Sequence, residues 1–498
     1  MSRPETKPRD SMSAEPVRPR PDRSRHAALA VLCAGMLMII LDGSIVTVAL
    51  PAIQRDLDFS PSNLTWTVNS YMIAFGGLLL LAGRLGDLLG RKRMFVAGLA
   101  LFTVASLLCG ISTSQEMLIA TRFVQGAGGA MASAVSLGML VTHFPEPRER
   151  AKAIGAFSFV GAAGASIGQV LGGILTQAMS WHWIFFINLP IGVAAAVVAV
   201  RVLEPDSGLG LRTGADGLGA LLVTAGLMLG VYAIVATDRS GWTSARTLGF
   251  TAFAVVLLTG FVVRQAKAAS PLLPLRMFRS RNVSGANLVQ ALMVSALFGF
   301  QILMALYLQN VLGYGAAKTG LAMLPAAVMI AIVSLGLSAR LSGRFGERNV
   351  LLAGIALLVV AIGLLTHLPT DASYVVDLLP TMRLAGGFGL AISALTALGM
   401  SAAGAGDAGV VSGLFNTAQQ VGGALGVAVL STFAAGHTRN LIADGRDRAS
   451  ALTGGFHLAF GIGTALLVAA FVLTLTILRE PEAPAEEVDL EAAASPTA

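Results

Sequence analysis

Residues 82–98 read "AGRLGDLLGRKRMFVAG", and residues 338–354 read "SARLSGRFGERNVLLAG". The two stretches align without gaps and share five identical residues, among them Arg84 with Arg340. Two further pairs of segments repeat in the same order: 121–130 with 382–391, and 155–168 with 413–426. The three offsets are 256, 261 and 258 residues, which indicates a chain built from two duplicated halves.

The composition is that of a membrane protein. Of the 498 residues, 55% are apolar and only 12% are charged, whereas soluble domains carry about 25% charged residues. A soluble core cannot absorb so much apolar surface, so we expect many helices in a lipid bilayer. Both cysteines, Cys33 and Cys109, lie in apolar runs and predict neither a disulfide nor a metal ligand.

Fourteen apolar segments are long enough to span a bilayer. They lie near 27–50, 64–83, 94–112, 117–142, 151–176, 183–203, 214–236, 247–266, 283–311, 319–342, 349–368, 376–400, 410–435 and 455–478. With the N-terminus in the cytoplasm, the tails and even-numbered loops hold 25 of the 34 Lys and Arg residues. This asymmetry places both termini inside and predicts an all-α polytopic protein.

The repeat also predicts the domain organisation. Equivalent loops follow the second and the tenth span, so two six-helix halves need an extra hairpin between them. We expect a disordered tail at 1–26, an N-terminal half at 27–205 and an inserted transmembrane hairpin at 206–270. A C-terminal half at 271–478 and a disordered acidic tail at 479–498 complete the chain.

One charge lies inside the first span. Asp42 interrupts the apolar run of residues 36–57, and a carboxylate near mid-bilayer costs about 2.5–3.5 kcal/mol on insertion scales. Charged groups in such positions mark ion and substrate paths by default. We interpret Asp42 as a proton-titratable carboxylate facing a central cavity. The alternative is a permanently paired aspartate that fixes helix packing.

Four motifs together resemble one family. They are "LDGSIVTVALP" at 41–51, "GRLGDLLGRKRM" at 83–94, "RFVQGAGGA" at 122–130 and "WHWIFFINLPIG" at 181–192. This combination resembles the major facilitator superfamily, in its fourteen-span branch of drug:proton antiporters. The resemblance implies export of drugs, antibiotics or similar organic compounds, driven by proton influx across a bacterial cytoplasmic membrane. One departure is Gln169, which stands where the fifth-helix motif usually has a proline.

The resemblance and the residue pattern assign candidate roles. Proton coupling falls to Asp42 and to Arg122, whose alternative role is that of a snorkelling arginine near the outer surface. A cytoplasmic gating loop comprises Gly83, Arg84, Gly86, Asp87, Gly90, Arg91 and Lys92; it also sets the topology. Close helix packing is assigned to Gly164, Gly168, Gly172 and Gly173. Candidate cavity side chains are Asn69, Gln125, Gln169, Asn188, Gln301, Asn416 and Gln419.

Other function classes fit less well. The sequence has no phosphate-binding Gly-rich loop and none of the common hydrolase motifs, so we expect neither an enzyme nor ATP-driven export. The nearest alternative is a proton-coupled symporter or uniporter that imports a small organic solute. We expect no cofactor other than protons, no metal and no nucleic-acid partner. The expected partners are an organic substrate and the lipid bilayer, and a monomer suffices.

Overall fold

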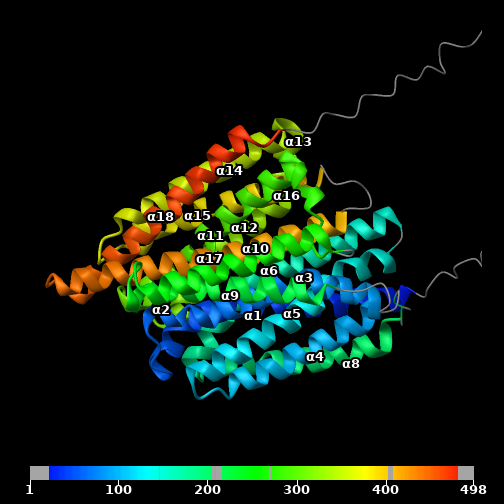
Figure 1. Cartoon of the computed structure of the whole chain (residues 1–498), viewed down its shortest axis with the longest axis horizontal. Helices are drawn as coiled ribbons and strands as arrows, with labels where there is room; N and C mark the ends of the chain where they lie inside the picture. Colours follow the sequence, from blue (N-terminus) through cyan, green and yellow to red (C-terminus); the bar gives the residue numbers. More distant parts are fainter. Residues whose placement is uncertain are drawn as a thin grey trace, which may run out of the picture.

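The structure is a computed structural model that describes residues 22–479 except 145, 205, 207, 209–215, 269–270 and 402–407. Every regular element in these residues is a helix (Figure 1). The predicted tails lie largely outside the described residues. The exceptions are the start of α1, which begins at Asp22 within the predicted N-terminal tail, and Arg479, the first residue of the predicted C-terminal tail.

The helices of the first half and the hairpin follow in chain order. They are α1 (Asp22–Asp56), α2 (Pro61–Leu64), α3 (Trp66–Leu89), α4 (Arg91–Gly110), α5 (Gln115–His143), α6 (Pro147–Ala178), α7 (Trp183–Phe186), α8 (Asn188–Val202), α9 (Gly217–Ser240) and α10 (Ala245–Lys267).

The second half contains both α-helices and short turns of other helix types. They are η2 (Leu275–Arg279), α11 (Arg281–Asn310), α12 (Ala316–Ile332), η3 (Val333–Leu337), α13 (Ser338–Phe345), α14 (Glu347–Leu364), η4 (Leu365–His367), η5 (Tyr374–Leu378), α15 (Leu379–Leu384), α16 (Gly386–Ser401), α17 (Ala408–Ala443) and α18 (Arg448–Thr476).

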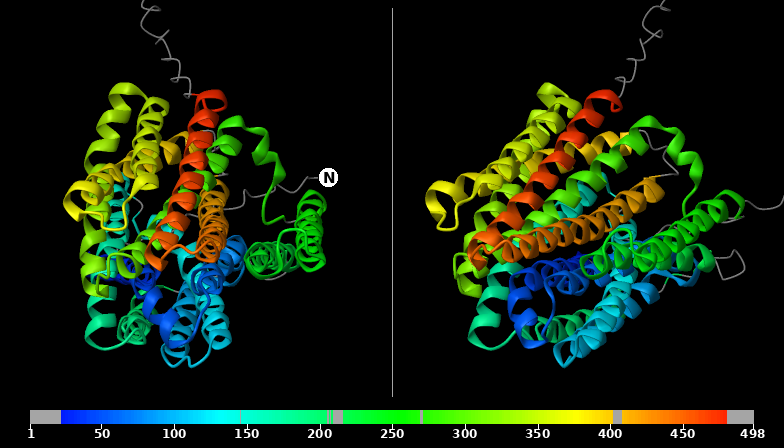
Figure 2. Two further views of the ribbon diagram at one scale, coloured as in Figure 1. Left: turned by 90° about the vertical axis from the view of Figure 1, so that its left-hand side faces the viewer. Right: turned by 60° about the vertical axis from the view of Figure 1, so that its left-hand side comes forward.

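The helices gather into two bundles. Buried apolar side chains form one large cluster centred on α1–α8 and a second one centred on α11–α18. We call these groups the N-terminal and the C-terminal bundle. The hairpin of α9 and α10 stands to one side of both, as the end-on view in Figure 2 shows. The two bundles meet along two seams, where α3 packs on α17 and α6 packs on α12.

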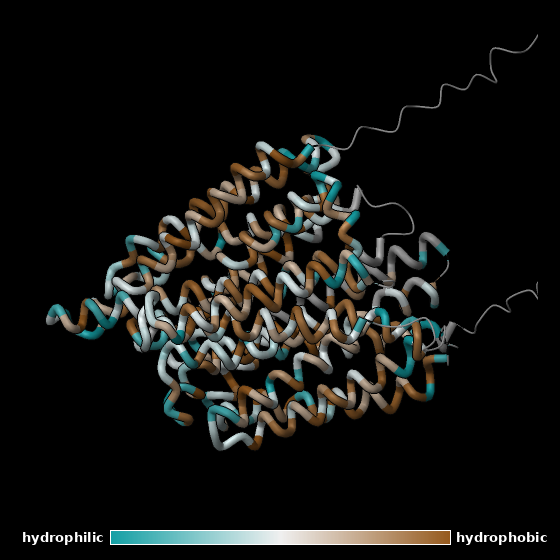
Figure 3. The backbone as a smooth tube through the Cα atoms, viewed as in Figure 1, coloured by the Kyte–Doolittle hydropathy of each residue, from teal (hydrophilic) through white to brown (hydrophobic). Residues whose placement is uncertain are grey.

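The two ends of the molecule differ. At one end α1 begins, α3 turns into α4, and α18 finishes; we call this the terminal end. At the other, the far end, α1 passes into α2, and α17 into α18. Figure 3 shows hydrophilic residues gathered towards these two ends, with mostly apolar helix between them. This distribution is the one expected of a membrane-spanning bundle.

Candidate membrane-crossing helices lie in both halves of the chain. Twelve helices in the described part of the chain are long and apolar enough to cross a bilayer. The predicted span at 319–342 lies on one continuous helical run, in which η3, a π-helical turn, joins α12 to α13. The predicted span at 151–176 corresponds to α6, several of whose side chains are not described. The count of fourteen therefore stays a prediction.

The duplicated loops have matching backbones. Gly90 ends α3 with a φ of +102°, and Gly346 ends α13 with a φ of +82°. A side chain is strained in this left-handed region, so glycine is favoured at both turns. The alignment of residues 82–98 on 338–354 thus reflects a shared helix–turn–helix in the two bundles.

Candidate functional site

A buried ion pair lies inside the N-terminal bundle. Arg122 of α5 donates from Nη1 to Oδ2 of Asp42 on α1 at 2.6 Å, and the two side chains are 1% and 0% exposed. Oδ1 of Asp42 accepts from Gln125 Nε2 at 2.8 Å and from Asn188 Nδ2 at 3.0 Å. The direct partners of this one carboxylate thus come from two other helices, α5 and α8.

Arg122 is held on several sides. Its Nε donates to the carbonyl oxygen of Thr67 at 2.9 Å. Its guanidinium carbon lies 4.3 Å from the ring centroid of Tyr71 and 5.7 Å from that of Phe185. Aromatic faces attract such cations, and the attraction strengthens when water is excluded. The arginine is therefore enclosed by the bundle and does not snorkel to a surface.

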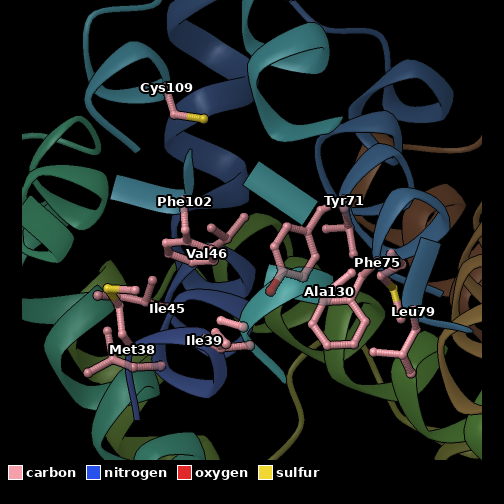
Figure 4. Close-up of a cluster of buried hydrophobic side chains, with 14 of the residues drawn as sticks. Met38, Ile39, Ile45, Val46, Tyr71, Phe75, Leu79, Phe102, Cys109 and Ala130 are labelled. Atoms are coloured by element: carbon pink, nitrogen blue, oxygen red, sulfur yellow. The ribbon is translucent and has the colours of Figure 1, made fainter. Parts of the chain in front are cut away.

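The network continues away from the ion pair. Gln125 donates to Ser106 Oγ at 2.8 Å, and Asn188 lies 3.4 Å from the same hydroxyl. The thiol of Cys109 lies 3.6 Å from Gln125 Oε1 and 3.3 Å from Thr121 Oγ1. Apolar side chains surround these groups, and Figure 4 shows Tyr71 and Phe102 among them. The low dielectric there strengthens each polar contact.

The enclosure corrects one prediction. We expected Asp42 to face a central cavity, but its carboxylate has no exposed surface in this structure. The reason is that Gln125 and Asn188, predicted as cavity residues, instead turn towards Asp42 and cover it. Both are fully buried.

The other candidate cavity residues are dispersed. Asn69 is fully buried, and neither its Oδ1 nor its Nδ2 has a hydrogen-bond partner in the described structure. Gln169 is buried on α6, where its backbone meets Gly320 of α12. In the C-terminal bundle Gln301 and Gln419 are half-buried, and Asn416 is exposed. The structure does not bring these five together through any hydrogen bond given for the described residues.

Sequence reasoning missed several members of the network. Ser106, Thr67 and Tyr71 contribute to it, as do Cys109 and Phe185. One signal was present: Ser106 and Cys109 are three residues apart, which places them on one helix face. The contribution of Thr67 is a backbone carbonyl, which no side-chain pattern reveals.

The loop between α3 and α4 is held from an unexpected side. Asp206, which follows α8, accepts the backbone N–H of Arg91 at 2.7 Å and that of Lys92 at 3.2 Å. Lys92 Nζ donates to the carbonyl oxygens of Val200, at 2.7 Å, and Leu203. The carboxylate thus meets the positive N-terminus of α4. Sequence reasoning missed Asp206.

Asp87 itself has a local partner. Its Oδ1 accepts from Arg91 Nη2 at 3.1 Å, an exposed pair four residues apart on the same chain segment. The glycines of the loop permit close approach: a methyl group at Gly90 would lie 2.8 Å from the carbonyl oxygen of Asp206. Gly83 has more room, with Ala134 Cβ at 3.9 Å. Arg84 is half-buried, and Gly86 is buried against Val135 of α5.

The packing glycines divide between two neighbours. A methyl group at Gly168 would lie 2.8 Å from the carbonyl oxygen of Leu41, and one at Gly172 would lie 2.6 Å from that of Ile45. Gly164 also faces α1, through Leu37. Gly173 faces α12 instead, with Ala316 O at 2.5 Å from such a group. These glycines let α6 approach both helices closely.

Comparison with known proteins identifies the family. The sequence profile of the Major Facilitator Superfamily matches residues 32–427. The chain belongs to the major facilitator superfamily. As a member of this superfamily it is a transporter, and its all-helical bundles agree with that assignment.

Its relatives include antibiotic resistance and export proteins. The chain is 36% identical over 465 residues to the puromycin resistance protein pur8 of Streptomyces alboniger, covering 91% of this chain and 92% of that one. It is 38% identical over 408 residues to the cephamycin export protein CmcT of Amycolatopsis lactamdurans, covering 81% and 84%.

Solved structures support the fold. A bacterial homolog of the human lysosomal transporter Spinster, in an inward-facing unoccupied conformation, superposes with a TM-score of 0.66 at 16% identity. The match covers 94% of this chain and all of that chain.

Proposed function

We propose that this protein is a proton-coupled antiporter that exports antibiotics or similar amphipathic organic compounds by alternating access. The observation that carries the proposal is the enclosed pair of Asp42 and Arg122, the most deeply buried charges described in the N-terminal bundle. Relatives named for puromycin resistance and cephamycin export support the substrate class and the outward direction.

The pair has two states with different energetics. With Asp42 ionised, the charge of Arg122 is balanced, and Gln125 and Asn188 complete the shell of the carboxylate. A proton on Asp42 removes the balancing charge and leaves Arg122 buried without a counter-ion. Losing one partner of a buried pair typically costs 3–5 kcal/mol. This cost is relieved if the bundle rearranges, so protonation biases the conformational equilibrium.

The access of protons to Asp42 then determines how transport is coupled to proton movement. Because the carboxylate is fully enclosed here, a proton exchanges only in a conformation that opens the network. We infer that substrate binding and protonation favour different arrangements of the same helices. Each would then displace the other, which is the thermodynamic basis of exchange.

The remaining features of the proposal follow from the sequence. The protein would span the cytoplasmic membrane fourteen times, with α9 and α10 as the inserted hairpin and both termini in the cytoplasm. The terminal end is then the cytoplasmic end, where the basic loop after α3 acts as a gate. A monomer with no cofactor would perform the cycle, with Asn69 and Gln169 among the residues that contact substrate.

The test uses purified protein in liposomes with an imposed pH gradient. Adding puromycin or an amphipathic dye should collapse the gradient through the wild-type protein and not through Asp42→Asn. Asp444→Asn, an exposed carboxylate at the far end, is the matched control and should behave like wild type. Equal drug-dependent proton flux through Asp42→Asn would refute the role of Asp42. Movement of protons and compound across the liposome membrane in the same direction, rather than in opposite directions, would favour an importer.

A further inference from the structure

The hairpin of α9 and α10 contacts both bundles, at the seam between α3 and α17. Figure 2 shows it beside this seam and away from the α6–α12 seam. Nothing in the proton site requires these two helices, so their placement needs a separate explanation. Their contacts show which bundle each part of the hairpin follows.

The hairpin is anchored to the C-terminal bundle. Trp242, in the turn of the hairpin, packs on Phe433 of α17 with ring centroids 5.5 Å apart. At the other end, Asp216 accepts from Arg264 at 3.0 Å and from Gln265 at 2.8 Å. Gln265 in turn accepts the backbone N–H of Leu273, in the segment that leads into α11. The base of the hairpin is thus tied to the chain that enters the C-terminal bundle.

The Asp216 carboxylate that accepts these hydrogen bonds is charged at neutral pH. Burial alone would raise the pKa of the Asp216 carboxyl, but hydrogen bonds from Gly219 N–H, Gln265 and Arg264 outweigh it. Together they hold the pKa of Asp216 below its ordinary value. The anchor therefore persists across the physiological pH range and is lost only in acid.

The contacts with the N-terminal bundle are of another kind. Tyr232 of α9 lies against Trp66 of α3, with ring centroids 6.4 Å apart. Thr224 of α9 lies against Gly77 of α3, so closely that a methyl group there would be 2.6 Å from Thr224 Oγ1 and 3.4 Å from its Cα. No hydrogen bond or ion pair given for the described residues joins α9 to α3. Leu227, Val231 and Val235 of α9 also belong to the buried apolar cluster centred on the N-terminal bundle. We call the contacts of Tyr232 and Thr224 with α3 the hairpin latch.

Hydrogen bonds join the two bundles at the far end and also along the α3–α17 seam, where Thr417 of α17 donates to the carbonyl oxygen of Gly76 on α3 at 3.3 Å. Gln309 of α11 donates to the carbonyl oxygen of Val48 on α1 at 2.9 Å, and Gln177 of α6 accepts the N–H of Ala317 on α12 at 3.1 Å. Near the terminal end, the hydrogen bonds described for the loop after α3 and for Arg348 stay within one bundle. The helices also splay towards the terminal end in Figure 1.

We propose that the hairpin is a releasable latch: it moves with the C-terminal bundle and grips α3 only while the far end is closed. Opening the far end separates the outer parts of α3 and α17, which breaks the contacts of Tyr232 and Thr224 with α3. The latch therefore favours the conformation that is open at the terminal end. This inference rests on the alternating access of the proposed function and not on proton coupling.

The test measures the population of the two conformations directly. Thr113 and Asp371 are exposed residues of the two bundles at the far end. Spin labels attached at Thr113→Cys and Asp371→Cys report the distance between the bundles there by double electron–electron resonance. Cys33→Ala removes the half-buried native thiol, and buried Cys109 stays. For protein in lipid nanodiscs, we expect a major short distance between the labels, from molecules closed at the far end. A minor long distance should come from molecules open there.

Two changes weaken the latch from opposite sides. Gly77→Ala inserts a methyl group against Thr224, and Tyr232→Ala removes the ring that meets Trp66. Each should raise the ratio of long to short distances about fivefold, the scale of a modest coupling between two states. Gly230→Ala, also on α9 but with its nearest neighbour Ala254 Cβ at 3.9 Å, is the control and should leave the ratio unchanged.

The possible outcomes distinguish a failure of the latch proposal from a failure of alternating access, on which it rests. An unchanged ratio in Gly77→Ala and Tyr232→Ala overturns the latch, as does an equal rise in Gly230→Ala. If one variant fails to fold, the other decides, because the two changes lie on different helices. A single distance in the parent protein at every pH, with and without puromycin, would instead contradict alternating access and the latch with it. Loss of proton coupling alone changes none of these distances.

Discussion

At the scale of single residues, the chain concentrates its buried charge in one place. Asp42 and Arg122 balance each other, and neither could be buried in lipid-surrounded helices alone without a large cost. The repeat provides an internal comparison: Arg383 aligns with Arg122, yet Arg383 is exposed. The arginine is buried in the N-terminal bundle because Asp42 of α1 balances its charge.

Arg122→Leu tests the energetic role of the pair. It leaves Asp42 buried without a counter-ion, so we expect the free energy of unfolding to fall by about 3–5 kcal/mol. Thermal unfolding in detergent measures this as a lowered Tm. Arg383→Leu, at the aligned exposed position, should change the Tm little.

The double variant Asp42→Asn/Arg122→Leu sharpens the same test. It removes both charges, so it should recover part of the stability that Arg122→Leu loses. A double variant less stable than either single one, or a Tm loss in Arg383→Leu as large as in Arg122→Leu, would contradict this account of the pair.

The sequence predicted the two central residues but not their surroundings. Asp42 and Arg122 stood out because charges are rare in apolar spans, and both lie in the site. Gln125 and Asn188 were recognised as polar but assigned to a cavity, since periodicity does not tell which neighbour a side chain faces. The backbone carbonyl of Thr67 and the ring of Tyr71 joined the site through tertiary packing alone.

At the scale of helices, the loop after α3 depends on a residue distant in sequence. Asp206 accepts two N–H groups at the start of α4, while Asp87 makes an exposed pair with Arg91. Caps of this kind are worth about 0.5–2 kcal/mol, whereas exposed pairs four residues apart contribute about 0.3–0.5 kcal/mol. The start of α4 is therefore held mainly by Asp206 and less by Asp87.

Asp206→Ala should accordingly lower stability by about 0.5–2 kcal/mol, because two backbone donors of α4 lose their acceptor. It should also speed protease cleavage between α3 and α4, which gel electrophoresis of timed digests detects. Asp87→Asn should leave both properties nearly unchanged. The assignment fails if the two variants are cleaved at the same rate.

The glycine face of α6 gives the next prediction. Gly168→Val inserts a side chain where a single methyl group would already lie 2.8 Å from the carbonyl oxygen of Leu41. We expect a cost of about 1–3 kcal/mol from overpacking, with separation of α6 from α1 and loss of transport. Thermal stability and dye efflux from cells measure the two effects.

Gly363→Ala on α14 serves as the control, because its nearest neighbour, Thr464 Cγ2, would lie 3.8 Å away. Stability and efflux should both stay near wild type there. Wild-type efflux in Gly168→Val would show that this face of α6 does not need its close approach to α1.

At the scale of the whole molecule, the repeat predicted more than the composition did. Matching turns at Gly90 and Gly346 follow directly from the aligned loops. The place of the hairpin beside the α3–α17 seam did not follow, because α9 and α10 have no counterpart within either bundle. The π-helical turn at Val333–Leu337 also left no signal, since the apolar run continues through it.

The two bundles have different roles in the proposed cycle. One bundle holds the buried charge pair, and the hairpin is tied to the other while it grips the first. Proton binding would therefore act within one bundle, and the latch between the two. In this cycle, we propose, Asp42 exchanges its proton for substrate.

The most direct measurement is proton release on substrate binding. Purified protein in weakly buffered detergent, at several acidic and neutral pH values, is mixed with puromycin or an amphipathic dye while an indicator records the pH. We expect release of about one proton per bound molecule from the wild-type protein and none from Asp42→Asn, with Asp444→Asn behaving like wild type. Equal proton release from Asp42→Asn, or binding without release in the wild-type protein at every pH, would contradict it.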